Sequence, residues 1–137
     1  MRDRFWSWVF VTGWCLLIFA LSSVPGRDLP ALPAENFDKL VHAGVYAILG
    51  ALFLNAARAT WSWRRATTAV FAVALATAFG VSDELHQLLT PGRSADVHDV
   101  LADAVGAALG ALVLSTVFAT RARRRAGVPP DEPRARS

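Results

Sequence analysis

Four long hydrophobic segments limit what this chain can fold into. Each approaches the roughly 20 apolar residues that a helix needs to cross a bilayer. With 54% hydrophobic residues in a chain of only 137, the composition is typical of membrane proteins rather than soluble domains. We predict an all-α fold, a bundle of four transmembrane helices within residues 1–120. The predicted helices cover residues 5–24, 40–57, 66–89 and 100–119.

The first segment has a second interpretation. Arg2 and Arg4 precede it, and Ala20-Leu21-Ser22 resembles the cleavage site of a signal peptide. Its apolar run is longer than the roughly 7–15 residues of a signal-peptide core. We therefore favour a retained helix over a cleaved signal peptide.

Basic residues are distributed unevenly between the loops. Eleven of the 14 lie before the first segment, in the loop 58–65 or in the tail 121–137, and the other three are Arg27, Lys39 and Arg93. Because cytoplasmic loops carry the excess of arginine and lysine, we predict a multi-pass plasma-membrane protein with both termini in the cytoplasm. Trp6, Trp8, Trp61 and Trp63 would lie at the cytoplasmic edge. The tail is predicted to be disordered and attracted to lipid headgroups. Because the membrane accounts for the placement of the basic residues, nucleic acid is not an expected partner.

Glycine recurs in the fourth segment at Gly106 and Gly110. This small-xxx-small pattern lets two helix backbones approach closely. We favour packing within the chain over packing between two copies of it.

Polar residues interrupt the apolar chain in three stretches, 38–46, 82–87 and 91–103. In the predicted topology all three lie on the outer side of the membrane. An ionisable side chain at the bilayer centre costs roughly 2.5–3.5 kcal/mol, so such residues are functional-site hypotheses by default. The three stretches predict one outward-facing polar site.

The first stretch spaces Asp38, His42 and Tyr46 four residues apart, along one stripe of a helix. A structural interpretation has Asp38 capping the helix, His42 donating to it and Tyr46 anchoring at headgroup level. A functional interpretation makes His42 a base whose tautomer is fixed by a partner.

The second stretch puts Asp83, His86 and Gln87 on one helix face, whereas Glu84 points about 100° away. We therefore expect Glu84 to be the most exposed member. A carboxylate and an imidazole one turn apart can be a general-base pair, two metal ligands or a solvated helix end.

The third stretch aligns Asp96, Asp99 and Asp103 at the start of the fourth helix, where the helix dipole favours carboxylates. Asp103 lies a full turn inside the membrane segment, so it needs a partner such as a histidine, Lys39 or Arg93. Arg93, in the preceding tight turn, is expected to face this stripe or an anionic headgroup, because its planar guanidinium suits phosphate.

Asp-Lys-x-x-His-x-x-x-Tyr, Ser-Asp-Glu-x-His-Gln, Pro-Gly-Arg and Asp-x-x-Ala-Asp-x-x-Gly together resemble the VanZ-like family of small bacterial membrane proteins. The resemblance runs from about residue 38 to residue 110 and includes the order and spacing of the motifs. The family's founding member contributes to low-level resistance to the glycopeptide teicoplanin, which implies a role in the cell envelope. This sequence departs from the family at Asp103, where members commonly have Asn. The resemblance implies functional roles for Asp38, Lys39, His42, Tyr46, Asp83, Glu84, His86, Gln87, Arg93 and Asp99.

Three functions fit these observations. The first is a site that binds or processes a lipid-linked envelope component, the second a structural or partner-binding membrane protein, and the third a proton- or ion-coupled carrier. The sequence does not separate an enzyme from a binder. It identifies no cofactor, with a divalent metal as an open alternative, and the expected partners are membrane lipids and a lipid-linked precursor. For the first function the expected catalytic residues are His42, His86, Asp83 and Asp99, the ligand contacts Lys39, Arg93, Tyr46 and Gln87, and the supporting residues Asp38, Glu84, Asp96 and Asp103.

Overall fold

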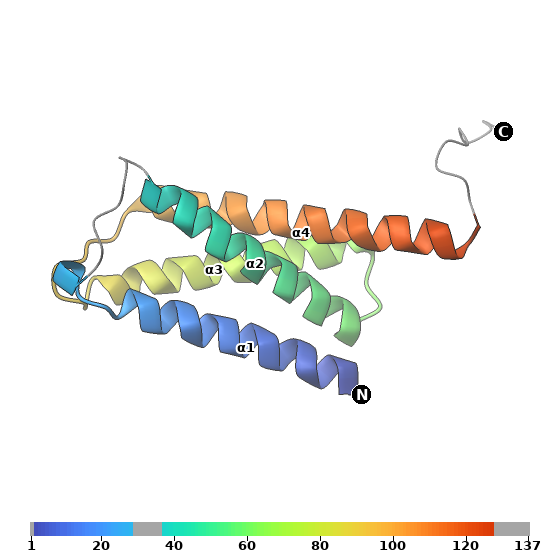
Figure 1. Ribbon diagram of the computed structural model, residues 1–137, viewed down its shortest axis with the longest axis horizontal. Helices are drawn as coiled ribbons and strands as arrows, with labels where there is room; N and C mark the ends of the chain where they lie inside the picture. Colours follow the sequence, from blue (N-terminus) through green and yellow to red (C-terminus); the bar gives the residue numbers. More distant parts are fainter. Residues whose placement is uncertain (1, 29–36, 128–137) are drawn as a thin grey trace.

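The computed structural model describes residues 2–28 and 37–127, which form four long helices. Figure 1 shows the helices lying lengthwise, with the chain reversing direction at each connection. All four are long and apolar enough to cross a membrane. The predicted all-α four-helix fold is therefore confirmed. The elements are α1 (Arg2–Ser22), a 3-10 turn η1 (Gly26–Asp28), α2 (Phe37–Thr60), α3 (Arg65–Gln87) and α4 (Val97–Arg125).

All four helices begin before the predicted segments, and α1 ends at Ser22, two residues earlier than predicted. α2 gains three residues at each end, and α4 runs from Val97 to Arg125. Asp96 caps α4, and the arginines of its last turn interact favourably with the helix dipole. Residues 121–125 of the predicted tail are thus helical, and residues 128–137 lie outside the described part. α3 ends at Gln87, two residues earlier than predicted, and Gly92 then turns the chain with a φ of 75°.

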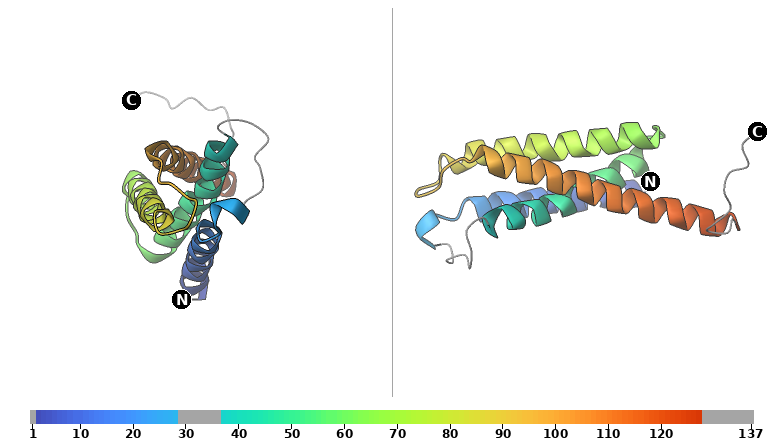
Figure 2. Two further views of the ribbon diagram at one scale, coloured as in Figure 1. Left: turned by 90° about the vertical axis from the view of Figure 1, so that its left-hand side faces the viewer. Right: turned by 90° about the horizontal axis from the view of Figure 1, so that it is seen from above.

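α2 is the central helix. It contacts each of the other three helices, and α1 and α4 also contact α3 (Figures 1 and 2). At Gly106 and Gly110 of α4, an added Cβ would overlap the backbones of Ala43 and Ala47 of α2. The predicted packing of these glycines within the chain is confirmed, and it brings α2 and α4 into backbone contact.

Small side chains fill much of the interior. Ala56, Ala72, Ala76 and Ala107 are fully buried between the helices, together with a few large side chains of α2 such as Leu49 and Leu54. Many other large apolar side chains face outward, including Leu112, which is 60% exposed. Small residues inside and large apolar residues outside are the pattern of helices packed in lipid.

The two ends of the bundle differ in character. Trp8, Trp61 and Trp63 gather at the end that holds the start of α1 and the α2–α3 connection, and the Trp8 indole donates to Thr60 Oγ1 at 3.0 Å. Trp6 lies nearby and packs edge-on against Phe5. The clustering predicted for the tryptophans at one edge is confirmed. The polar stretches lie at the opposite end.

Candidate functional site

The three polar stretches converge at the end of the bundle that holds the α3–α4 connection (the left side of Figure 1). α2 supplies the first stretch, α3 the second, and α4 with its preceding turn the third. Ser22, the last residue of α1, and Ser23 after it also reach this end, and neither was among the predicted site residues. These two polar residues close the first hydrophobic segment at the same depth, which is the signal in the sequence that would have found them.

Lys39 forms ion pairs with three carboxylates. Its Nζ lies 3.2 Å from Asp38, 3.1 Å from Asp96 and 3.2 Å from Asp99. The predicted role of Lys39 was to hold an anionic ligand, but here its ammonium is already shared among three acidic side chains. Asp38 and Asp96 are half-buried, whereas Asp99 is buried.

His42 connects α2 to α4. Its Nδ1 lies 3.0 Å from Asp103 Oδ1, and its Nε2 lies 3.9 Å from Asp99 Oδ2. Because a carboxylate only accepts, we assign the proton of the neutral ring to Nδ1. The prediction that Asp103 needs a partner, with a histidine among the candidates, is confirmed. The structural alternative in which His42 donates to Asp38 is replaced by this longer-range bond.

Glu84 is buried, and the expectation that it would be the most exposed member of its stretch was wrong. Only 4% of the residue is accessible. One carboxylate oxygen accepts from the Asp96 backbone N–H at 2.8 Å, and the other accepts from Gln87 Nε2 at 3.0 Å. Rotating away from the face of Asp83 turns Glu84 toward the start of α4 rather than outward, because α3 packs against more than one helix.

Asp83 and His86 do not form the acid–base pair that their spacing allowed. Asp83 accepts from Ser22 Oγ at 2.7 Å and from Gln87 Nε2 at 3.3 Å. His86 is instead bonded to Ser23 Oγ at 2.9 Å and stacks on Phe19. His86 therefore packs on the end of α1, and its ring is bonded to Ser23 rather than to Asp83.

Asp96 ends the α3–α4 connection as the cap of α4. Its Oδ1 accepts from the His98 backbone N–H and from His98 Nδ1, each at 2.8 Å, and its Oδ2 from Lys39. The His98 backbone N–H, the His98 ring and then the Lys39 ammonium hold the pKa of Asp96 well below its usual range. Asp96 is thus ionised and joins Lys39 of α2 to the start of α4.

A cavity of about 290 Å³ opens beside this network. Apolar side chains of α1 and α2 form part of its wall, among them Leu21 and Val41, which are also exposed on the outside of the bundle. Three lining residues carry buried polar atoms with no hydrogen-bond partner in the described part of the chain: Tyr46 Oη, Asp83 Oδ1 and Arg93 Nε. The polar residues that line the cavity are Ser22, Asp38, His42, Tyr46, Asp83 and Arg93.

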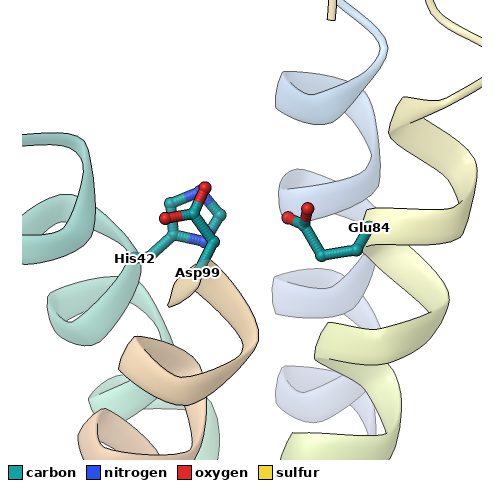
Figure 3. Close-up of side chains that lie close together, drawn as sticks. All are labelled: His42, Glu84 and Asp99. Carbon is teal, nitrogen blue, oxygen red and sulfur yellow. The ribbon is translucent and has the colours of Figure 1, made fainter. Parts of the chain in front are cut away.

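One group of side chains has the composition of a metal site. His42 of α2, Glu84 of α3 and Asp99 of α4 each present one ligand atom, and these atoms lie within 4.8 Å of one another. Figure 3 shows the Glu84 carboxylate pointing across the bundle toward His42 and Asp99. Imidazole and carboxylate are ordinary ligands for divalent transition metals.

A model of the VanZ/LLP1 family matches residues 5–119 of the chain. No curated protein and no solved structure matches the chain. The match covers all but the ends of the sequence, and it agrees with the resemblance of the polar motifs. The chain therefore belongs to the VanZ/LLP1 family and is a multi-pass membrane protein.

Proposed function

We propose that this VanZ/LLP1-family protein binds the anionic headgroup of a lipid-linked cell-envelope component. The observation that carries the proposal is the cavity at the polar end, which combines apolar walls with three buried polar atoms that lack a partner. A buried polar group without a hydrogen bond costs roughly 1–3 kcal/mol. A ligand that supplies the missing bonds would offset this cost.

Arg93 is the cation available to a ligand in the cavity. Lys39 is already bonded to three carboxylates, whereas Arg93 Nε is without a partner among the described residues. A guanidinium binds phosphate through two parallel bonds. We therefore expect a phosphate of the headgroup to lie against Arg93, with the Tyr46 hydroxyl donating to an ester or sugar oxygen.

The walls of the cavity suit the hydrocarbon part of a lipid. Leu21 of α1 is 55% exposed and Val41 of α2 is 45% exposed, and both also line the cavity. The volume of about 290 Å³ lies just below the range of roughly 300–1,000 Å³ for ligand pockets. It would accommodate a headgroup, and the lipid chain would run out along α1 and α2 into the bilayer.

Any chemistry on the headgroup would rest on His42. Of the predicted catalytic residues, His42 and Asp83 line the cavity, and Asp103 fixes the imidazole by accepting from its Nδ1. The other nitrogen, Nε2, would then keep one lone pair, which can take a proton as a general base or bind a metal ion, but not both at once. Asp83 would orient the ligand through its unpaired oxygen.

The proposal places the polar end on the outer side of the membrane, because most basic residues flank the opposite end. The test uses a Cys15→Ala background with a single cysteine introduced as Ser94→Cys or Ala126→Cys. In intact cells, a membrane-impermeant maleimide should label the first variant and not the second. Labelling with the reverse preference would refute the orientation.

Headgroup binding is tested with purified protein in nanodiscs of neutral lipid. The probes are a fluorescent polyprenyl phosphate, the matching uncharged polyprenol and phosphatidylglycerol. We expect the polyprenyl phosphate to bind at least tenfold more tightly than the polyprenol, and Arg93→Gln to remove this preference. Arg27→Gln is the control, because Arg27 is exposed near this end and pairs only with Asp28 among the described residues.

Equal affinity for the phosphate and the alcohol, or equal losses in Arg93→Gln and Arg27→Gln, would refute headgroup binding. Equal affinity for phosphatidylglycerol and polyprenyl phosphate would identify a general lipid phosphate as the ligand, and tighter binding of phosphatidylglycerol would refute a preference for the lipid-linked precursor.

A second candidate, a purely structural role for the polar residues, is favoured by the bonds between helices. Ser22 joins α1 to Asp83 of α3, and His42 joins α2 to Asp103 of α4. The two functions separate in Tyr46→Phe, which keeps the ring and removes a hydroxyl that has no partner among the described residues. Lower lipid affinity at unchanged stability supports the binding site, whereas no change in either supports the structural role.

A further inference from the structure

We propose that His42, Glu84 and Asp99 bind one divalent transition-metal ion, with Zn²⁺ and Mn²⁺ as the fitting ions. The three ligand atoms come from three different helices and lie within 4.8 Å of one another (Figure 3). The inference does not depend on headgroup binding, because it rests on the donor set and on the residues that hold the donors.

Each donor is oriented by a further polar group. Asp103 holds His42 through Nδ1 at 3.0 Å, which leaves Nε2 to face Asp99. Lys39 bonds Asp99 Oδ1 at 3.2 Å, so that Oδ2 is the oxygen nearest the imidazole. Metal-binding histidines almost always donate their second nitrogen to a carboxylate or carbonyl. This network therefore has the form of a metal site with its second shell in place.

Two hydrogen bonds also fix the orientation of the Glu84 carboxylate. Gln87 Nε2 and the Asp96 backbone N–H each donate to one of its carboxylate oxygens. A carboxylate oxygen has two lone pairs, so each retains one for a metal ion. Together these bonds hold the carboxylate in the direction that Figure 3 shows, toward His42 and Asp99.

The charges also point to a bound cation. Glu84 is 4% exposed and Asp99 is 9% exposed, so both carboxylates are removed from water. Lys39 pairs with Asp99, but in the described part of the chain no lysine or arginine forms an ion pair with Glu84. A buried carboxylate is costly unless it is paired or coordinates a metal. An ion between these side chains would supply the missing positive charge.

The geometry fits ions that bind at short distances. At bond lengths of roughly 2.0–2.2 Å, tetrahedral ligands lie about 3.5 Å apart. The distance of 3.9 Å between His42 Nε2 and Asp99 Oδ2 is close to this value, and small side-chain rotations would bring in Glu84. The imidazole ligand favours Zn²⁺, whereas the two carboxylates also suit Mn²⁺. Three protein ligands leave at least one position for water or another ligand.

The first experiment titrates purified, chelator-treated protein in detergent with Zn²⁺ alone and with Mn²⁺ alone by calorimetry. We expect one ion per chain, and a loss of affinity of at least tenfold in Glu84→Gln. His98→Gln is the matched control, since His98 is exposed at the same end of the bundle and outside the proposed site. Its affinity should equal that of the wild type.

The second experiment needs no substitution at the site. Pulsed electron paramagnetic resonance of the Mn²⁺-bound wild type should show coupling to one imidazole ¹⁴N, which ¹⁵N-histidine labelling converts to ¹⁵N coupling. The His98→Gln variant should keep this signal. Arg93→Gln should also keep it while losing lipid affinity, which separates this inference from headgroup binding.

The inference is overturned if folded wild-type protein takes up neither ion at 100 µM, a concentration of about the order of weak protein metal sites. It is also overturned if bound Mn²⁺ shows no histidine coupling, or if His98→Gln loses as much affinity as Glu84→Gln.

Discussion

Replacing Gly106 with alanine would place a methyl group in the contact between α2 and α4. At ideal geometry the added carbon lies 2.7 Å from both the Cα and the carbonyl carbon of Ala43, and closer still to the carbonyl oxygen. Carbon atoms ordinarily rest about 3.5–4.0 Å apart, so the two helices must separate locally by about 1 Å. The atoms in the way belong to the backbone and cannot rotate aside.

The expected cost follows from two opposing effects. Forcing an extra methyl group into a well-packed interior costs about 1–3 kcal/mol, whereas alanine is favoured over glycine within a helix by about 0.5–1 kcal/mol. Gly44→Ala on α2 provides the matched control, because a Cβ there meets no atom within 4 Å. Both variants gain the same helix preference. The difference between them therefore isolates the overpacking, and we expect Gly106→Ala to be less stable than Gly44→Ala by about 1–3 kcal/mol.

The assay is unfolding of the purified protein in mixed micelles with increasing mole fraction of sodium dodecyl sulfate, followed by tryptophan fluorescence. Trp14 is a suitable reporter, because its indole donates to the Val45 carbonyl and thus joins α1 to α2. Gly44→Ala should unfold at the same or a higher mole fraction than the wild type. If Gly106→Ala is as stable as Gly44→Ala, the backbone contact between α2 and α4 is not as close as the structure has it.

Three further predictions concern the polar end. Ser22→Ala removes the 2.7 Å hydrogen bond to the buried Asp83 and should lower the free energy of unfolding by about 1.5–3 kcal/mol in the same assay. Ser23→Ala is the control, and it should have a smaller effect because Ser23 is exposed. Equal losses in the two variants would refute the argument from burial. Because the pKa of Asp96 is lowered in the folded protein, its stabilising contribution is present above the unfolded value near 3.9 and is lost as the pH falls below it. The wild type should therefore lose stability between pH 6 and pH 3 more steeply than Asp96→Asn, and parallel pH profiles would contradict this. Lys39→Met should destabilise the protein at pH 7 more than the charge-conserving Lys39→Arg, as read from the two unfolding midpoints.

The helices and one contact of the site could be predicted because membrane physics leaves few alternatives. Segments of about 20 apolar residues must become helices to satisfy their backbone in lipid. Asp103 lies inside such a segment, so it required a partner, and a histidine at the same depth was among the candidates. The structure pairs it with His42. Depth in the membrane, read from the sequence, was sufficient to predict that Asp103 needs a partner, and the structure selects His42 among the candidates.

The position of Glu84 could not be predicted by the same reasoning. A helical wheel gives the angle between Asp83 and Glu84, but it does not say how many sides of α3 are covered. Asp83 bonds to Ser22 of α1, and Glu84 bonds to the backbone of Asp96 before α4. Adjacent residues on α3 therefore face different neighbours, and both are buried. The arrangement of the neighbouring helices decides which sides of α3 are buried, and this arrangement cannot be inferred from a single sequence.

The cavity could not be predicted from the sequence for a related reason. Its lining combines the end of α1, the start of α2, Asp83 of α3 and the turn that carries Arg93. The turn is held against the chain after α1 by the bond from the Gly26 N–H to the Pro91 carbonyl at 3.0 Å. Neither Gly26 nor Pro91 indicates this contact in the sequence. The cavity can therefore be recognised only when the positions of the helices are known.

Asp103 shows how the packing of the bundle creates a demand for positive charge. The side chain is fully buried, and it fits because α3 has a glycine opposite: a Cβ at Gly80 would lie 2.6 Å from Asp103 Oδ2. That oxygen has no partner among the described residues, and the other accepts from His42. With Glu84 and Asp99, three buried carboxylates therefore surround one imidazole, and Lys39 reaches only Asp99 of the three. Helix packing explains how these side chains fit together, but it does not offset their charge, and a divalent cation at His42 would.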